Sequence, residues 1–326
     1  MGEARPQRAC ERGHSYLTGG ARSSTVAIVT KTTDARSTSD VEIPTRVLVL
    51  GMAHHDGTIV AEELYPVADA CGLTGDQVRS CLRRLVAEGL FTRDGDGREA
   101  VYQATASGMR ALGASMERTR LAYAQDAAGR GWDRTWHLAA FAIPEAKRAA
   151  RDAFRDHLLD LGGAAIQNGL YVSPHRWEKD VLAEAGRLGV GDNVTVATTD
   201  DLDIGGEHDP RAIAARLWPI DAVAANYQVF VDMYEGVPDS LEQMRRNKRR
   251  LAEADFLPGS LVIGIKFQEC FSTDPLLPPE LLPRPWPGRR ARDLIARSRR
   301  LGILVREEHN KPALFAPFDD IVETIN

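Results

Sequence analysis

The side chains best suited to recognising another molecule lie within residues 74–98. The first group belongs to one expected helix and consists of Gln77, Arg79, Ser80, Arg83 and Arg84. Guanidinium, amide and hydroxyl groups can hydrogen-bond base edges in a DNA groove, and guanidinium groups also bind phosphate. These side chains are therefore suited to recognising nucleic acid.

The helix that positions these side chains is predicted to begin at Thr74, because Thr74 and Gln77 fit a capping box. Its apolar residues recur with the spacing of a buried stripe and are Val78, Leu82, Leu85 and Val86. The arginines then occupy the opposite face, and Gly89 ends the helix.

A short hairpin is expected directly after this helix. Residues 90–93 and 99–103 flank an alternation of aspartate and glycine at residues 94–97, and glycine supplies the positive φ that a tight turn requires. Arg93 and Arg98 lie near the tip. A basic helix that leads into a glycine-tipped hairpin is typical of a winged helix-turn-helix, in which the helix enters the major groove and the wing touches phosphates.

Two shorter helices are expected upstream, at residues 44–52 and 61–71, with Gly72 in the turn before Thr74. Two helices joined by a brief glycine-containing turn are the signature of a helix-turn-helix. One alternative is a three-helix module whose arginine face is merely solvated, and another is a winged helix that binds protein. The adjacent hairpin favours DNA binding over the first alternative. The second stays open, and the dependence of binding on salt separates it from DNA binding.

Composition limits the classes of protein that this chain can be. It has 326 residues, enough for two or three domains, and a net charge of −5. That charge argues against indiscriminate coating of nucleic acid. No segment resembles a membrane span or a signal peptide, so a cytoplasmic location is expected. The four cysteines form no C-x-x-C pair, which argues against a disulfide framework or a structural zinc site.

Composition and periodicity divide the chain into five expected parts. Residues 1–40 form a disordered leader, and residues 41–104 form the winged helix-turn-helix DNA-binding domain. Residues 105–130 form a linking helix, residues 131–205 a ferredoxin-like domain, and residues 206–326 a mainly helical C-terminal domain. The predicted fold class is therefore α+β.

The order β-α-β-β-α-β predicts the ferredoxin-like domain. Its strands are expected at residues 136–143, 164–167, 170–173 and 193–199, and its helices at residues 146–161 and 179–188. In the C-terminal domain, helices are predicted at residues 211–217, 222–234, 240–254 and 289–301, with an apolar interruption at residues 258–267.

Two arginine clusters lie on these C-terminal helices, at residues 245–250 and 289–300. One cluster could hold the phosphates of a coenzyme A moiety, because guanidinium groups bind phosphate through paired hydrogen bonds, while tryptophans wall the apolar acyl group. The candidate effector-binding residues are Trp132, Trp136, Arg245, Arg246, Arg249, Trp286, Arg289 and Arg290. A solvated helix face and accessory contact with DNA phosphates remain open as alternatives.

Other polar groups give weaker patterns. Residues 54–56 (His-His-Asp) and the acidic loop at residues 200–209 suggest a metal site but lack partners at ligand spacing. A metal-dependent nuclease that uses the ferredoxin-like domain is the enzymatic alternative. The chain has no nucleophile elbow, P-loop or dinucleotide fingerprint. The prediction is therefore a non-enzyme without catalytic residues, cofactor or metal.

Three separated segments resemble one known family, the phenylacetic-acid catabolic repressor (PaaX) family. They are the proline-rich run at residues 274–288, the segment from Gly131 to Arg151 together with residues 169–174, and the expected recognition helix at residues 73–90. The similarity spans about residues 41–300. The leader and the Gly75–Asp76 pair at the start of the helix depart from the family pattern, so the DNA sequence read and the effector are expected to differ.

The resemblance implies a bacterial transcriptional regulator that acts as a homodimer. It also implies a winged helix, a ferredoxin-like middle domain and a helical C-terminal domain. The implied function is repression of an aromatic-acid or related catabolic operon, with release from operator DNA by an acyl-CoA thioester.

Overall fold

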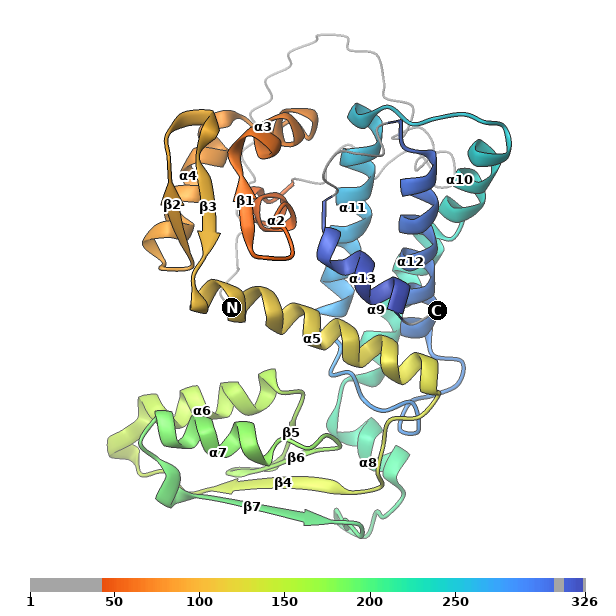
Figure 1. The fold of residues 1–326 in the computed structure, drawn as a ribbon. Helices are drawn as coiled ribbons and strands as arrows, with labels where there is room; N and C mark the ends of the chain where they lie inside the picture. The colour runs from red at the N-terminus through yellow and green to blue at the C-terminus, as the bar shows by residue number, and fades with distance from the viewer. Residues whose placement is uncertain (1–42, 308–313, 325–326) are drawn as a thin grey trace, which may run out of the picture.

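The computed structural model describes residues 43–307 and 314–324, and this part of the chain combines helices with two antiparallel sheets. The predicted α+β class is confirmed. The leader expected at residues 1–40 lies outside the described residues. Figure 1 shows the N-terminal unit and the C-terminal helices side by side, with the long helix α5 running below both and the second sheet beneath it. None of the described helices is both long and apolar enough to cross a bilayer.

The N-terminal unit contains three helices and a small sheet. Its elements are α2 (Thr45–Gly51), β1 (Thr58–Val60), α3 (Ala61–Ala70), α4 (Gly75–Ala87), β2 (Phe91–Asp94), the 3-10 turn η1 (Gly97–Glu99) and β3 (Val101–Ala104). The sheet order is β1-β3-β2, with both pairs antiparallel. The hairpin lies where the sequence predicts it, and β1 is an additional strand that it did not predict.

The helix α5 (Ala106–Ala128) links this unit to the rest of the chain. Thr105 caps its N-terminus, because the Thr105 hydroxyl accepts a hydrogen bond from the backbone N–H of Gly108 at 3.1 Å, and Gly129 in the left-handed region caps its C-terminus. A Cβ at Gly108 would lie 2.0 Å from the carbonyl oxygen of Leu90, so only glycine allows this close approach between α5 and the hairpin.

The middle unit has the predicted β-α-β-β-α-β order. Its elements are β4 (Trp136–Phe141), α6 (Arg148–Asp160), β5 (Ala164–Gln167), β6 (Leu170–Ser173), α7 (Glu178–Arg187) and β7 (Val194–Thr199). The strand order is β5-β6-β4-β7, and every neighbouring pair is antiparallel. Figure 1 places α6 and α7 together on one face of this sheet, where Phe154, Leu158 and Val181 are buried.

The C-terminal part is helical. It consists of α8 (Pro210–Leu217), α9 (Ile220–Tyr234), α10 (Val237–Arg246), α11 (Glu253–Phe271), α12 (Pro287–Val305) and α13 (Ala316–Thr324). The prediction of a helix at residues 240–254 followed by an apolar interruption at residues 258–267 is wrong, because α11 runs through that interval, Pro258 included. Leu261 and Ile265 are buried in the same core as the N-terminal unit, and this burial outweighs the low helix propensity of the segment.

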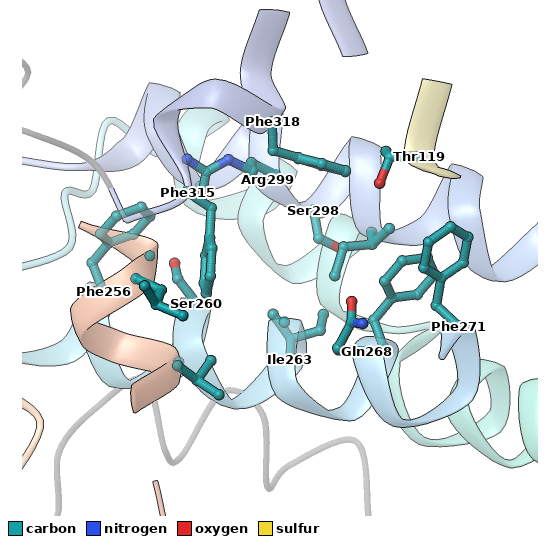
Figure 2. A pocket seen from close by; sticks show the side chains of 18 of the residues that line it. Thr119, Phe256, Ser260, Ile263, Gln268, Phe271, Ser298, Arg299, Phe315 and Phe318 are labelled. Carbon is teal, nitrogen blue, oxygen red and sulfur yellow. The ribbon is translucent and has the colours of Figure 1, made fainter. Parts of the chain in front are cut away.

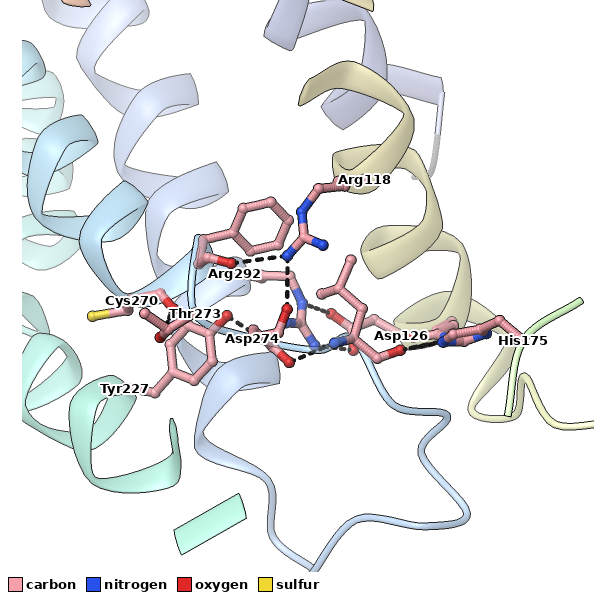
Figure 3. A network of polar contacts seen from close by, with 11 residues as sticks. Arg118, Asp126, His175, Tyr227, Cys270, Thr273, Asp274 and Arg292 are labelled. Atoms are coloured by element: carbon pink, nitrogen blue, oxygen red, sulfur yellow. Dashed lines mark hydrogen bonds and ion pairs between the residues drawn. The ribbon is translucent and has the colours of Figure 1, made fainter. Parts of the chain in front are cut away.

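A buried polar network joins α5 to the C-terminal helices (Figure 3). Arg292 on α12 bonds both carboxylate oxygens of Asp126 on α5, at 2.5 and 2.9 Å, and its third nitrogen lies 3.5 Å from Asp274. The Tyr227 hydroxyl donates to the same carboxylate oxygen of Asp274, Oδ2, at 2.8 Å. Burial alone would lower the pKa of Arg292, but the hydrogen bond and charge of Asp126 raise it, so the guanidinium stays charged.

The same network reaches the middle unit. Arg118 on α5 donates to the carbonyl oxygens of Phe271 and Asp274, at 3.2 and 2.7 Å. The carbonyl of Leu276, two residues further on, accepts a hydrogen bond from His175 at 2.8 Å. Residues 271–276 therefore connect α5, the C-terminal helices and the middle unit through their own backbone.

Candidate nucleic-acid interface and ligand pockets

The helix α4 is built as the sequence predicts. Its capping box is complete, because Gln77 N–H donates to the Thr74 hydroxyl at 3.3 Å and Thr74 N–H donates to Gln77 Oε1 at 2.7 Å. Val78, Leu82 and Leu85 are buried. The side-chain amide oxygen of Gln77 therefore takes part in the helix cap. The sequence predicted a DNA contact for this side chain and did not assign it this second role.

The outer face of α4 is exposed and basic. Arg79, Ser80, Arg83 and Arg84 all lie on the surface. Arg79 donates to Asp76 at 2.5 Å, and this hydrogen bond raises the pKa of Arg79. Among the described residues, Arg83 has no ion pair or hydrogen bond. The Asp76 carboxylate thus orients the Arg79 guanidinium, whereas the Arg83 guanidinium is available to an acceptor on another molecule.

The hairpin beside α4 carries the other two predicted contacts. Arg93 on β2 bonds Asp96 at 2.7 Å, and Arg98 lies on η1 between the two strands. Both side chains are exposed, and Gly95 and Gly97 adopt the positive φ angles expected of this turn. All seven residues predicted to contact DNA are therefore exposed and lie on α4 or the adjoining hairpin.

The predicted effector residues do not form one site. Trp136 is only 1% exposed and packs between Trp132 and Trp218, with ring centroids 5.1 and 6.3 Å away. The Trp286 ring contacts Tyr227, with ring centroids 6.2 Å apart, and also packs against the core cluster that contains Trp136. All three predicted tryptophans therefore belong to packed hydrophobic cores.

The predicted arginines are also dispersed. Arg245 and Arg246 both bond Glu242 at the end of α10, at 2.8 and 3.2 Å. Arg290 bonds Glu235 at 2.7 Å, and Arg249 and Arg289 are exposed. Of the eight predicted effector residues, only Arg246 lines one of the two pockets described next.

The first pocket is apolar and has a volume of about 400 Å³. Figure 2 shows side chains from α11 and α12, together with Thr119 of α5, Phe318 of α13 and Phe315 just before α13. Val47, Leu50 and Gly51 of α2 also line the pocket. The second pocket, about 370 Å³, is polar and is lined by Asp239, Glu242, Arg246, Arg297, Arg300 and Leu301. The apolar pocket is not among the sites predicted from the sequence, where its signal is the mixture of Phe, Gly and Ser along residues 256–271.

The candidate metal groups form local pairs. His54 contacts Glu63 at 2.6 Å, and His208 lies between Asp201 and Asp203, at 3.2 and 3.4 Å. Across residues 43–307 and 314–324, histidine, cysteine and carboxylate side chains nowhere gather in a group of three that could hold a metal ion.

Comparison with known proteins gives matches along most of the chain. The PaaX-like protein family matches residues 46–108, the PaaX protein central Cas2-like domain matches residues 129–214, and the PaaX-like protein C-terminal domain matches residues 218–303. The transcriptional repressor PaaX of Escherichia coli (strain K12) is 26% identical over 243 residues, which cover 74% of each chain.

One solved structure is similar in fold. An uncharacterized protein from Mycobacterium tuberculosis, Rv0674, aligns with a TM-score of 0.51 and 22% identity. The alignment covers 81% of this chain and 99% of that one.

The repressor relative and the three consecutive family matches define the class: this chain is a DNA-binding transcriptional repressor and not an enzyme. The nuclease alternative is therefore wrong. The three matches follow the order of the structural units, from the N-terminal unit through the middle sheet to the helical part. The chain belongs to the PaaX family.

Proposed function

We propose that this repressor recognises a specific operator through a winged helix-turn-helix formed by residues 43–104. The observation that carries the proposal is the capped helix α4, whose arginine face is exposed directly beside a hairpin with two further arginines. In this arrangement α4 is the recognition helix, and the β2–β3 hairpin is the wing.

The residues divide by role. Arg79, Ser80 and Arg83 approach base edges, because they stand on the exposed face of α4, and Gln77 reaches a base through its amide nitrogen. The phosphate contacts come from Arg84, Arg93 and Arg98. Since the whole chain carries a net charge of −5, binding to random DNA is weak and the specific contacts contribute most of the preference.

The middle unit, in this proposal, is a ferredoxin-like domain, because its order and pairing match a split βαβ sheet. The repressor acts as a homodimer in the cytoplasm, where operator DNA lies. Met109 and Leu121, which are 41% and 39% exposed on α5, suit a contact between two copies.

The effector is an acyl-CoA thioester, as known for the family that this chain belongs to. Arg246, Arg297 and Arg300 around the polar pocket suit its phosphates. A binding-shift titration of the protein–operator complex should show release by members of a CoA-thioester panel and not by the matching free acids. Release by the acids alone would exclude a phosphate-binding role for these arginines.

Operator recognition is tested by fluorescence anisotropy with DNA from the region upstream of the repressor's own gene. A shuffled duplex of the same composition is the control. We expect preference for the natural duplex, and affinity that falls steeply with salt because phosphate contacts release counterions. Equal affinity for both duplexes would contradict sequence recognition, and binding insensitive to salt would favour a protein-binding winged helix.

A further inference from the structure

The apolar pocket lies where the DNA-binding unit meets the C-terminal helices. Its volume of about 400 Å³ falls within the range of small-molecule sites. Val47, Leu50 and Gly51 of α2 form one wall, and α11 and α12 form the opposite one. A molecule in this pocket would therefore touch both units at once.

The lining favours a ring. It contains the aromatic side chains Phe256, Phe271, Phe315 and Phe318, which Figure 2 labels, and also Phe267. Between them stand residues with little or no side chain, Gly259, Gly264 and Gly302, which leave the space open. Aromatic side chains pack well against a planar group in edge-to-face or offset geometry.

Ser298 supplies a polar anchor in this apolar lining. Ser298 is 6% exposed and lines the pocket. Its hydroxyl has no hydrogen-bond partner in the part of the chain that the structure describes. A buried hydroxyl without a partner is costly, so a ligand with a hydrogen-bond acceptor would gain from supplying one.

Charge in the pocket argues against a carboxylate ligand. Arg299 lines it, but its guanidinium bonds both carboxylate oxygens of Asp319 and donates to the carbonyl of Leu314 at 2.5 Å. A carboxylate would have to displace this ion pair or remain unpaired beside it. A neutral carbonyl can instead accept from Ser298 and leave the pair intact.

A series of direct contacts links the pocket to α4 through Phe315 and α2. Phe315 N–H donates to the carbonyl of Gly51 at 2.6 Å, and a Cβ at Gly51 would lie 2.7 Å from the Phe315 ring. Leu48 and Val49 of the same helix α2 belong to the core that includes Val78 and Leu82 of α4. A ligand that moves Phe315 or α2 therefore changes how α4 is held against the C-terminal helices.

We propose that this pocket binds neutral aromatic ketones, and that occupancy changes the affinity for DNA. The effect of the ligand on DNA affinity rests on the proposed operator-binding function. The ligand regulates only by the difference in its affinity for the DNA-bound and free forms.

Binding is tested by isothermal titration calorimetry of the full chain with 2-acetonaphthone and with 2-naphthoate, which share the ring system and differ in charge. We expect one site per chain for the ketone and at least tenfold weaker binding of the carboxylate. Equal binding of the two, or no binding of the ketone, would overturn the proposal.

Two variants locate the site. Ser298→Ala should weaken ketone binding roughly fivefold, which corresponds to one net hydrogen bond. Gly264→Leu should abolish it, because a Cβ there already lies 3.5 Å from the Phe315 ring and a longer side chain fills the space. The matched control is Gly186→Leu on α7, where a Cβ meets open space. Unchanged binding in both pocket variants would place the ligand elsewhere and contradict the proposal.

The effect on DNA is measured by anisotropy with the operator duplex at increasing ketone concentrations. We expect a shift in the DNA dissociation constant for the natural protein and for Gly186→Leu, and none for Gly264→Leu. If the protein binds both DNA and the ketone but the DNA dissociation constant does not change, the proposal that the ligand regulates DNA binding is wrong. If the ketone binds and no duplex is preferred, the proposed function fails while the pocket assignment stands.

Discussion

The helices α4 and α12 are both rich in arginine, but the structure uses their arginines in opposite ways. On α4, Arg79, Arg83 and Arg84 are all exposed. On α12, Arg289 and Arg297 face outward, whereas Arg292 is 4% exposed and bonds Asp126. The reason is position, because α4 buries one stripe while α12 packs against α9, α10 and α11. The arginines of a run are thus all exposed where the helix buries a single stripe, as on α4, and some become buried where neighbours surround the helix, as on α12.

The largest effect is expected where the arginine is buried. Arg292→Met should lower the free energy of unfolding by about 3–5 kcal/mol, because it leaves the buried Asp274 and the partly buried Asp126 without their cation. Urea denaturation followed by circular dichroism measures this loss. Arg289→Met, at an exposed position three residues earlier, should change stability by no more than about 0.5 kcal/mol. Equal stability of the two variants would remove the distinction between the inner and outer faces of α12.

On α4 the expected effect is on recognition and not on stability. Arg83→Ala should reduce the preference for operator over shuffled DNA by about 1–3 kcal/mol, the contribution of one bidentate contact with guanine. Arg79→Ala should act in the same direction. Anisotropy with both duplexes gives the ratio, and thermal unfolding checks the fold. A variant that keeps full preference would show that the exposed face of α4 does not read bases.

The wing should give a smaller effect of another kind. Arg93→Ala and Arg98→Ala should each weaken binding to all duplexes about equally and reduce the salt slope by about one unit, since each removes one phosphate contact. Binding measured at four or more salt concentrations gives the slope. Altered base preference with an unchanged slope would assign sequence reading to the hairpin in place of the helix.

The smallest effect concerns His175 at the junction with the middle unit. Burial lowers the pKa of His175 below its ordinary value of 6.5, although the hydrogen bond to Leu276 opposes this. The folded protein therefore holds a neutral imidazole while the unfolded chain takes up a proton first. The stability should be complete above pH 6.5 and should fall as the pH drops from there through the lower folded pKa.

Thermal unfolding between pH 5 and pH 8 measures this dependence. The His175→Gln variant can still donate to the Leu276 carbonyl but does not titrate, so its profile should be flatter than that of the natural protein over this interval. Identical profiles would show that another group carries the acid sensitivity.

The elements set by local sequence were predicted well. The capping box at Thr74 and Gln77 determines the start of α4, because its two hydrogen bonds span only three residues. The hairpin at Gly95 and Gly97 depends equally on near neighbours. The exposed arginine face follows from the spacing of the apolar stripe, so the candidate DNA-binding residues could be named without a structure.

Other features depend on contacts between distant parts of the chain. The strand β1 exists because Thr58–Val60 pairs with β3, more than forty residues away in the sequence. The helix α11 continues through Pro258 because its apolar residues are buried between other helices. The residues within β1 and α11 form no local pattern that predicts either element.

The sequence alone determined the family resemblance, the order of the units and the helix whose arginines form one exposed face, because each depends on residues close together in the chain. The tertiary structure alone decided which arginine of α12 is buried, that the predicted tryptophans are core residues, and that an apolar pocket opens between α2 and α11. Those outcomes depend on which surfaces meet when helices far apart in the chain pack together, and burial at these contacts, more than residue type, determines whether a side chain is structural or free to bind.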